Sequence, residues 1–105
     1  MELYKRHTHL YSSEAKRGLL NVRNLLTGRM LLIKSEDFTK DIQSIRFQLD
    51  LGSYPHDHLQ KEYDHLGLEL FTIEIYKEVS DSHRDLQEVL ESERISLHHN
   101  NTLLY

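Results

Sequence analysis

Two short stretches near the N-terminus decide the fold: residues 18–24 (GLLNVRN) and residues 29–34 (RMLLIK). Both are rich in aliphatic side chains, and the residues between them, 25–28 (LLTG), end in a glycine. A hairpin turn needs backbone at positive φ, which glycine adopts without steric penalty, so the pattern predicts a β-hairpin. Leucine-rich stretches of this length also occur in helices, and periodicity alone does not separate the two.

The segment after the hairpin has the periodicity of a helix. Its apolar residues recur three or four positions apart and form one stripe: Phe38, Ile42, Ile45 and Leu49. Ser35 is the expected N-cap, with acidic residues following it at the positive end of the helix dipole. Gly52 supplies the left-handed residue that ends the helix.

The second half of the chain predicts a helix, a strand and a final helix. A helix opens at Pro55 and ends at Gly67, and residues 68–79 then alternate with period two, which is typical of a strand with one buried face. Residues 82–85 resemble a capping box that leads into a last helix. The predicted fold class is therefore α+β, a small three-stranded antiparallel β-sheet flanked by helices in the order ββααβα.

The length and composition describe one domain over residues 1–105. The chain is 38% hydrophobic and 29% charged and has no cysteine, which excludes a disulfide framework, a zinc knuckle and a thiol nucleophile. No apolar run approaches 18 residues and no signal peptide is recognisable, so we expect a cytoplasmic protein with no membrane partner. We divide it into an N-terminal extension, 1–17, and a core at about 18–97.

Charge is distributed unevenly along the chain. Residues 1–34 carry seven basic and two acidic side chains, whereas residues 35–105 carry six basic and fifteen acidic ones. The net charge is −4, and a protein that binds phosphates nonspecifically is usually basic. The balance disfavours strong nonspecific binding to DNA but leaves room for a local groove.

The order and spacing of these segments resemble the GIY-YIG nuclease domain, in its small bacterial stand-alone form. Residues 18–20 (GLL) stand where that family has its GIY tripeptide, and residues 32–34 (LIK) where it has YIG. Residues 46–67 are similar to the two middle helices of the family, and Leu90-Glu91 resembles the start of its metal-site helix. The similarity covers about residues 18–97. It rests on several motifs that are weak individually but occur in the same order as in the family.

The resemblance implies cleavage of phosphodiester bonds in DNA with one divalent cation, Mg²⁺ or Mn²⁺. The family uses tyrosines, an arginine and a histidine around the scissile phosphate, and a glutamate that holds the metal. This chain departs from that pattern at the matching positions: Leu20 and Leu32 replace the tyrosines, Lys34 a glycine, Ile45 the histidine, and either Asp41 or Ser44, depending on the gap, the arginine. Leucine and isoleucine carry neither a proton nor a charge, so no intact catalytic residue is expected, and no cofactor.

Glu91 is the position that keeps the family's residue type, and it is the candidate metal ligand. It lies in a glutamate-rich helix, where a merely solvated carboxylate is the simpler explanation. Lys34 stands where the family has a glycine beside the metal, so its ammonium could take the place of the cation and pair with Glu91.

Three functions compete. We favour a non-catalytic binding or regulatory module, with a protein partner or a second copy of the chain. The alternatives are a DNA-binding protein and a divergent active nuclease that uses Glu91. The DNA-binding alternative requires its candidate arginines to converge on one face: Arg17, Arg23, Arg29 and Arg46. The eight histidines follow no metal-ligand spacing, and we expect them to lie at the surface.

Overall fold

A computed structural model describes residues 16–105 of the chain. The elements along it are β1 (Gly18–Asn24), β2 (Met30–Ser35), α2 (Phe38–Leu51), α3 (Asp57–Leu66), the 3-10 turn η1 (Leu68–Leu70), β3 (Phe71–Glu78) and α4 (Leu86–His99). The predicted order ββααβα is confirmed. The prediction was wrong at residues 68–70, where a helical turn replaces the start of the expected strand.

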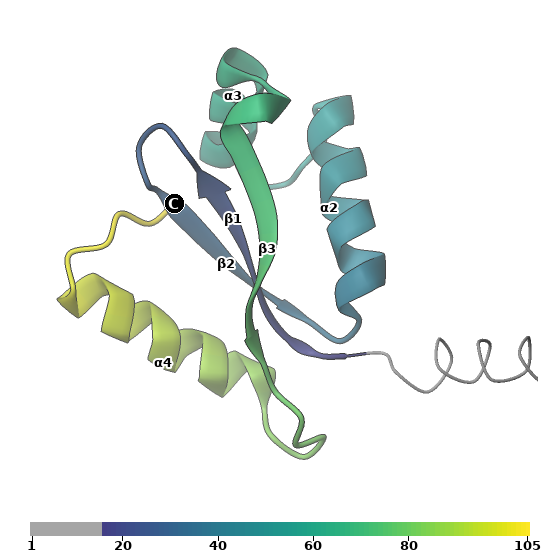
Figure 1. The fold of residues 1–105 in the computed structure, drawn as a ribbon, viewed down its shortest axis with the longest axis vertical. Helices are drawn as coiled ribbons and strands as arrows, with labels where there is room; N and C mark the ends of the chain where they lie inside the picture. The colour runs from purple at the N-terminus through teal and green to yellow at the C-terminus, as the bar shows by residue number, and fades with distance from the viewer. Residues whose placement is uncertain (1–15) are drawn as a thin grey trace, which may run out of the picture.

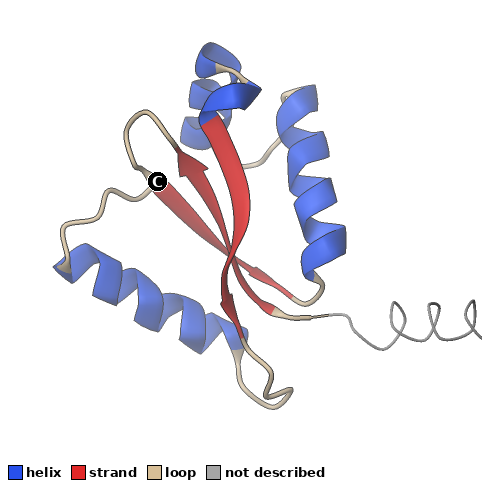
Figure 2. Cartoon of the chain, viewed as in Figure 1, coloured by secondary structure: helices blue, strands red, loops and turns tan. Residues whose placement is uncertain are grey.

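The three strands form one antiparallel sheet in the order β2-β1-β3, so the first strand is the central one (Figures 1 and 2). The β1–β2 hairpin runs in register from Gly18 opposite Ser35 to Arg23 opposite Met30. Its turn closes with Gly28 at φ 78°, which is the positive-φ role predicted for that glycine. The α+β fold class is therefore confirmed in architecture as well as in order.

Helices cover both faces of the sheet. The helices α2 and α3 pack on one face, against Leu20 and Val22 of β1, and α4 lies across the other, against Leu19 and Leu32 (Figure 1). Successive side chains of a strand point to opposite faces, so an unbroken aliphatic run such as the start of β1 can serve two cores. In the third strand, Phe71 and Ile73 pack in the cluster under α2 and α3, and Tyr76 packs against the cluster under α4.

The helix caps differ in part from those predicted. Asp37, not Ser35, is the N-cap of α2, and its carboxylate accepts a hydrogen bond from the backbone N–H of Lys40. Gly52 ends α2 in the left-handed conformation, as predicted. The second helix begins after Pro55, at Asp57, with the His56 side chain as its N-cap.

The end of the chain returns to the sheet, beyond the core boundary predicted at about residue 97. The backbone N–H of Met30 donates to the carbonyl of Leu103 (3.0 Å), and that of Tyr105 donates to the carbonyl of Met30 (2.9 Å). These bonds form a parallel bridge between Met30 and Leu104 on the outer edge of β2. The last residues therefore belong to the folded unit.

Candidate functional site

Leu20 and Leu32, where the resemblance expects tyrosines, are both part of the hydrophobic core. Leu20 is 0% exposed and packs with the residues of α2 and α3, whereas Leu32 is buried in the cluster under α4. The two side chains lie on opposite faces of the sheet, so they line no common surface. A leucine side chain has no group that can donate or accept a proton, so neither position offers one.

The three predicted positions on α2 have different surroundings. Ile45 is buried in the same cluster as Leu20, and Ser44 is exposed. Asp41 is half-buried, and its Oδ2 accepts a hydrogen bond from the Oγ of Ser35 (2.5 Å). Ser35 Oγ in turn accepts from the backbone N–H of Asp37 (3.2 Å), so the carboxylate of Asp41 ties the end of β2 to the first turn of α2.

A cavity of about 480 Å³ lies at the end of β2. Lys34 and Asp41, two positions that the resemblance assigns to the family's site, line it together with Arg17. The whole lining is Arg17, Lys34, Ser35, Glu36, Asp41, Asp85, Leu86 and Gln87. Arg17 and Glu36 neutralise each other, which leaves one cation, Lys34, with the carboxylates of Asp41 and Asp85. The remaining charge is negative, and it opposes the approach of a phosphodiester.

Arg17, whose side chain is 17% exposed, is a structural clamp. Its guanidinium donates to both carboxylate oxygens of Glu36 (2.8 and 3.3 Å). It also donates to the backbone carbonyls of Asp81 (2.8 Å) and Arg84 (3.0 Å), which joins the start of β1 to the β3–α4 loop. The hydrogen bond raises the pKa of Arg17 and lowers the pKa of Glu36.

The other candidate arginines do not assemble into one cationic surface. Arg23 pairs with Glu74 (Nε to Oε1 3.5 Å), and Arg29 donates to the carbonyl of Leu104 (2.9 Å) with its guanidinium carbon 5.6 Å from the centre of the Tyr105 ring. Arg46 is exposed on α2, the helix that covers the opposite face of the sheet from α4. The convergence that a DNA groove requires is not found in this arrangement.

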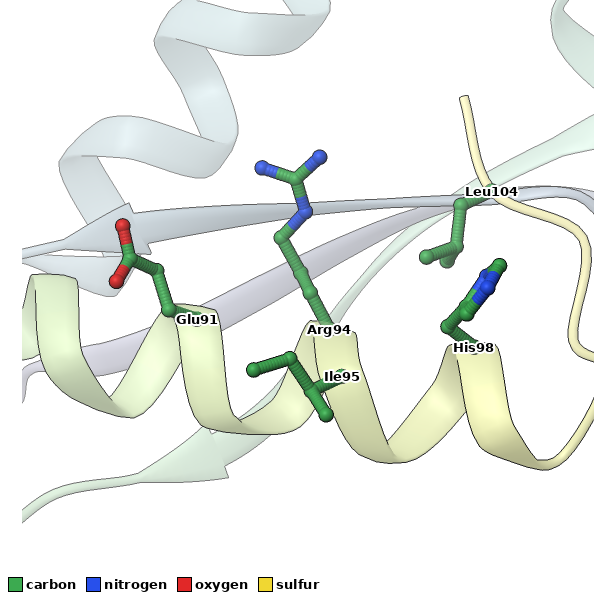
Figure 3. Close-up of a pocket in the computed structure, with 5 residues that line it drawn as sticks. All are labelled: Glu91, Arg94, Ile95, His98 and Leu104. Carbon is green, nitrogen blue, oxygen red and sulfur yellow. The ribbon is translucent and has the colours of Figure 1, made fainter.

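Glu91 is exposed on α4 and borders a second pocket (Figure 3). Its Oε1 accepts a hydrogen bond from Nε2 of Gln87 (3.1 Å), one helical turn earlier. The expected ion pair with Lys34 was wrong, because no N···O distance between them is within 4.0 Å; Lys34 faces the cavity that Gln87 borders instead.

Glu91 is the carboxylate that lines this pocket. Over residues 16–105, no three histidine, aspartate or glutamate side chains come together as a metal site. The pocket beside Glu91 also contains the guanidinium of Arg94, which opposes a second positive charge. Mg²⁺ is held in proteins by one or two carboxylates with waters completing the shell, and here one exposed carboxylate has an amide donor as its neighbour.

Two polar clusters were missed by the sequence reasoning. The first centres on Glu93, whose carboxylate accepts from the Tyr76 hydroxyl (3.2 Å) and the Lys77 ammonium (3.3 Å). Adjacent residues of a strand normally point to opposite faces, but a bulge in β3 opposite Leu19 and Leu20 brings both side chains to α4. No sequence signal for this bulge is present.

The second cluster surrounds Tyr105. The Tyr105 hydroxyl accepts from Nδ2 of the buried Asn24 (3.1 Å), and the rings of His56 and His58 lie edge-on to it with centroids 6.1 and 5.1 Å away. Burial and a hydrogen bond to Glu62 raise the pKa of Tyr105 to about 12, so the phenol stays protonated at neutral pH. His58 lies at the surface, as predicted, and His56 is half-buried, although both contact the Tyr105 ring; His7 and His9 lie outside the described residues.

No helix in the described part of the chain is both long and apolar enough to cross a membrane. A scan against protein-family models and a search of curated proteins find no match. A search of solved structures finds the catalytic domain of homing endonuclease I-TevI, at a TM-score of 0.66 and 21% identity over 82% of this chain and 89% of that chain. It also finds a glutamate-to-alanine variant of that domain, at a TM-score of 0.64 and 20% identity over 82% of this chain and 84% of that chain. I-TevI is a GIY-YIG homing endonuclease, and the chain has the GIY-YIG-like fold.

Proposed function

We propose that this chain is a non-catalytic binding or regulatory module built on the GIY-YIG-like fold, acting in the cytoplasm on a protein partner. The observation that carries the proposal is the burial of Leu20 and Ile45 in one hydrophobic cluster. Groups that deliver protons or clamp a phosphate must reach substrate, and side chains at these positions face the core. Catalytic groups that act as a unit leave little activity when several are missing.

A protein partner is favoured over DNA by the surface of the domain. Three of the four candidate arginines are engaged with Glu36, Glu74 or the Leu104 carbonyl, and the remaining charge of the cavity at Lys34 is negative. Large apolar side chains are meanwhile exposed on several elements, among them Phe47 (65%) and Leu51 (64%) one turn apart on α2. Contiguous exposed apolar surface is characteristic of protein contacts.

The decisive experiment incubates the purified protein with end-labelled single- and double-stranded DNA in Mg²⁺ and in Mn²⁺. We expect no cleavage in either metal and no salt-dependent gel shift. Cleavage that Glu91→Ala abolishes would establish an active nuclease with Glu91 as its metal ligand and overturn the proposal. A gel shift that weakens with salt, without cleavage, would establish the DNA-binding alternative.

Calorimetry with Mn²⁺ separates a metal role for Glu91 from a role for the Lys34 charge. We expect no Mn²⁺ binding to the wild-type protein, because Glu91 is the lone carboxylate in its pocket. Binding by Lys34→Gly alone would mean that the lysine excludes the metal through its charge. Equally tight Mn²⁺ binding by the wild-type protein and by Lys34→Gly would contradict the expectation that the protein holds no metal cofactor.

A further inference from the structure

The outer edge of β2 already accepts a strand from within the chain. The tail joins it through Met30, whose N–H and C=O both point away from β1 and bond to Leu103 and Tyr105. Backbone groups alternate in direction along a strand, so those of Leu32 and Lys34 point to the same outer side. Within residues 16–105, no backbone or side-chain partner bonds the N–H of Leu32 or Lys34 there. The edge is therefore occupied at one end and open over the rest of its length.

A hydrophobic pocket lies beside this edge. It has a volume of about 400 Å³ and is lined by Glu91, Arg94, Ile95, His98 and Leu104 (Figure 3). Leu104 is the tail residue that bridges to Met30, and α4 packs on β2, so the pocket lies where the tail, α4 and the strand edge meet. Ile95 is 59% exposed, which leaves apolar surface at the pocket.

Arg94 lies at this pocket, and Lys34, the other cation near the edge, shares its cavity with the carboxylates of Asp41 and Asp85. The ammonium of Lys34 and the guanidinium of Arg94 make no ion pair within 4.0 Å and no side-chain hydrogen bond. Arg94 extends away from the axis of α4 on the side where Glu91 and His98 also project (Figure 3). Glu91 is held by Gln87 and does not neutralise Arg94.

We infer that the open edge of β2 binds an extended segment of another protein, which adds parallel to β2 alongside Leu32 and Lys34 and carries an apolar and an acidic side chain. Backbone hydrogen bonds to Leu32 and Lys34 supply the ladder, the apolar side chain enters the pocket at Ile95 and Leu104, and the carboxylate meets Arg94. The inference rests on the proposed function and specifies its partner.

The occupant is a peptide because of the kind of groups that the edge presents. Alternating N–H and C=O groups at strand spacing match another backbone, and a phosphodiester chain offers no donors for the carbonyls. The segment is acidic because Arg94 lines the pocket without an ion pair within 4.0 Å, whereas Lys34 shares its cavity with the carboxylates of Asp41 and Asp85. A second copy of this chain is the competing occupant, and the experiment includes it as an outcome.

Fluorescence anisotropy with a synthetic octapeptide tests this inference. The probe alternates isoleucine or valine with aspartate or glutamate and carries a fluorescein label. One control peptide replaces the acidic residues with lysine, and a second keeps the acidic side chains but methylates alternate backbone nitrogens, which removes ladder donors. The protein variants are Arg94→Glu and, as the matched charge reversal, Lys61→Glu on the exposed face of α3.

We expect saturable binding of the acidic peptide to the wild-type protein, weakened about tenfold by Arg94→Glu and unchanged by Lys61→Glu. The methylated and lysine peptides should not bind the wild-type protein. Equal binding of the methylated peptide, no binding of the acidic peptide, or indifference to Arg94→Glu would overturn the inference. A dimer of the free protein in light scattering that the peptide does not dissociate would assign the edge to a second copy.

The outcomes of this experiment are separate from those of the nuclease assay. DNA cleavage would overturn the non-catalytic proposal whether or not the peptide binds. Absence of both cleavage and peptide binding would leave the module non-catalytic and remove β2 as its docking edge. Circular dichroism of Arg94→Glu checks its fold, and the methylated peptide tests the ladder on the wild-type protein without any mutation.

Discussion

Introducing a tyrosine at Leu20 tests whether this position, where the resemblance expects a catalytic tyrosine, is too tightly packed to hold one. The Leu20 side chain is fully buried, and its cluster is built from hydrocarbon side chains such as Val22, Phe38 and Ile45. Tyrosine is larger than leucine, and overpacking of a filled core destabilises by about 1–3 kcal/mol. Its hydroxyl would also be buried among hydrocarbon groups, which costs about 1–3 kcal/mol more when no hydrogen bond forms.

The two effects together predict that Leu20→Tyr lowers the free energy of unfolding by about 2–6 kcal/mol, a large part of the roughly 5–15 kcal/mol of a typical domain. The matched control is Ile75→Tyr, which places the same side chain at a neighbouring position of the sheet that is 54% exposed. Equilibrium urea unfolding measures both variants. The reasoning is refuted if Leu20→Tyr stays within about 1 kcal/mol of the wild-type protein, because the position would then have room for a phenol and its hydrogen bonds.

Four further predictions follow from other contacts. Gly18→Ala should lower the free energy of unfolding by about 3 kcal/mol or more, because a Cβ at Gly18, where φ is +152°, would lie 2.0 Å from the Lys77 carbonyl oxygen. Gly28→Ala should lower it less, because no atom lies within 4 Å of a Cβ built there, and urea unfolding compares the two variants. Arg17→Gln should lower Tm more than Lys16→Ala, because Arg17 makes four hydrogen bonds and Lys16 one 3.8 Å ion pair; equal shifts in calorimetry would contradict the clamp. The pKa of Glu36 is lowered in the folded state, so its contribution is present above the unfolded pKa and lost as pH falls through the lowered value; the Arg17→Gln protein should lack this part of the acid-side decline in stability. The pKa of Tyr63 is raised to about 12 by burial and by its hydrogen bond to Asp50, so stability should hold up to pH about 10 and fall as pH rises towards 12, and Tyr63→Phe should flatten that fall in urea titrations.

Much of the fold could be predicted from local sequence because its determinants are local. Gly28 and Gly52 have the backbone conformations that their neighbours require, and the stripe from Phe38 to Leu49 turns one face of a helix inward. The start of α2 was less predictable. Ser35 and Asp37 are both good capping residues, and the choice between them depends on the contact of Ser35 with Asp41 in the folded protein.

The candidate site was predictable in its residues and not in its arrangement. The sequence shows aliphatic side chains at Leu20, Leu32 and Ile45, but it does not reveal that Leu20 and Leu32 serve opposite faces of the sheet. It also lists Arg17 among candidate phosphate ligands, and only the loops that fold around its guanidinium make it a clamp. The predicted ion pair between Lys34 and Glu91 was wrong for the same kind of reason. Gln87 donates to Glu91, and it also lines the cavity that Lys34 faces.

The amino-acid sequence by itself determined the order of helices and strands, the turns between them and the aliphatic side chains at three positions where the resemblance expects catalytic residues. These properties depend on residues within a few positions of one another, where backbone geometry and side-chain chemistry act directly. Only the tertiary structure decided that the tail pairs with Met30, that a bulge brings Tyr76 and Lys77 to Glu93, and that Arg94 and Leu104 line one pocket. Contacts of this second kind join residues far apart in the chain, and strand register and helix placement set them through the packing of the whole domain.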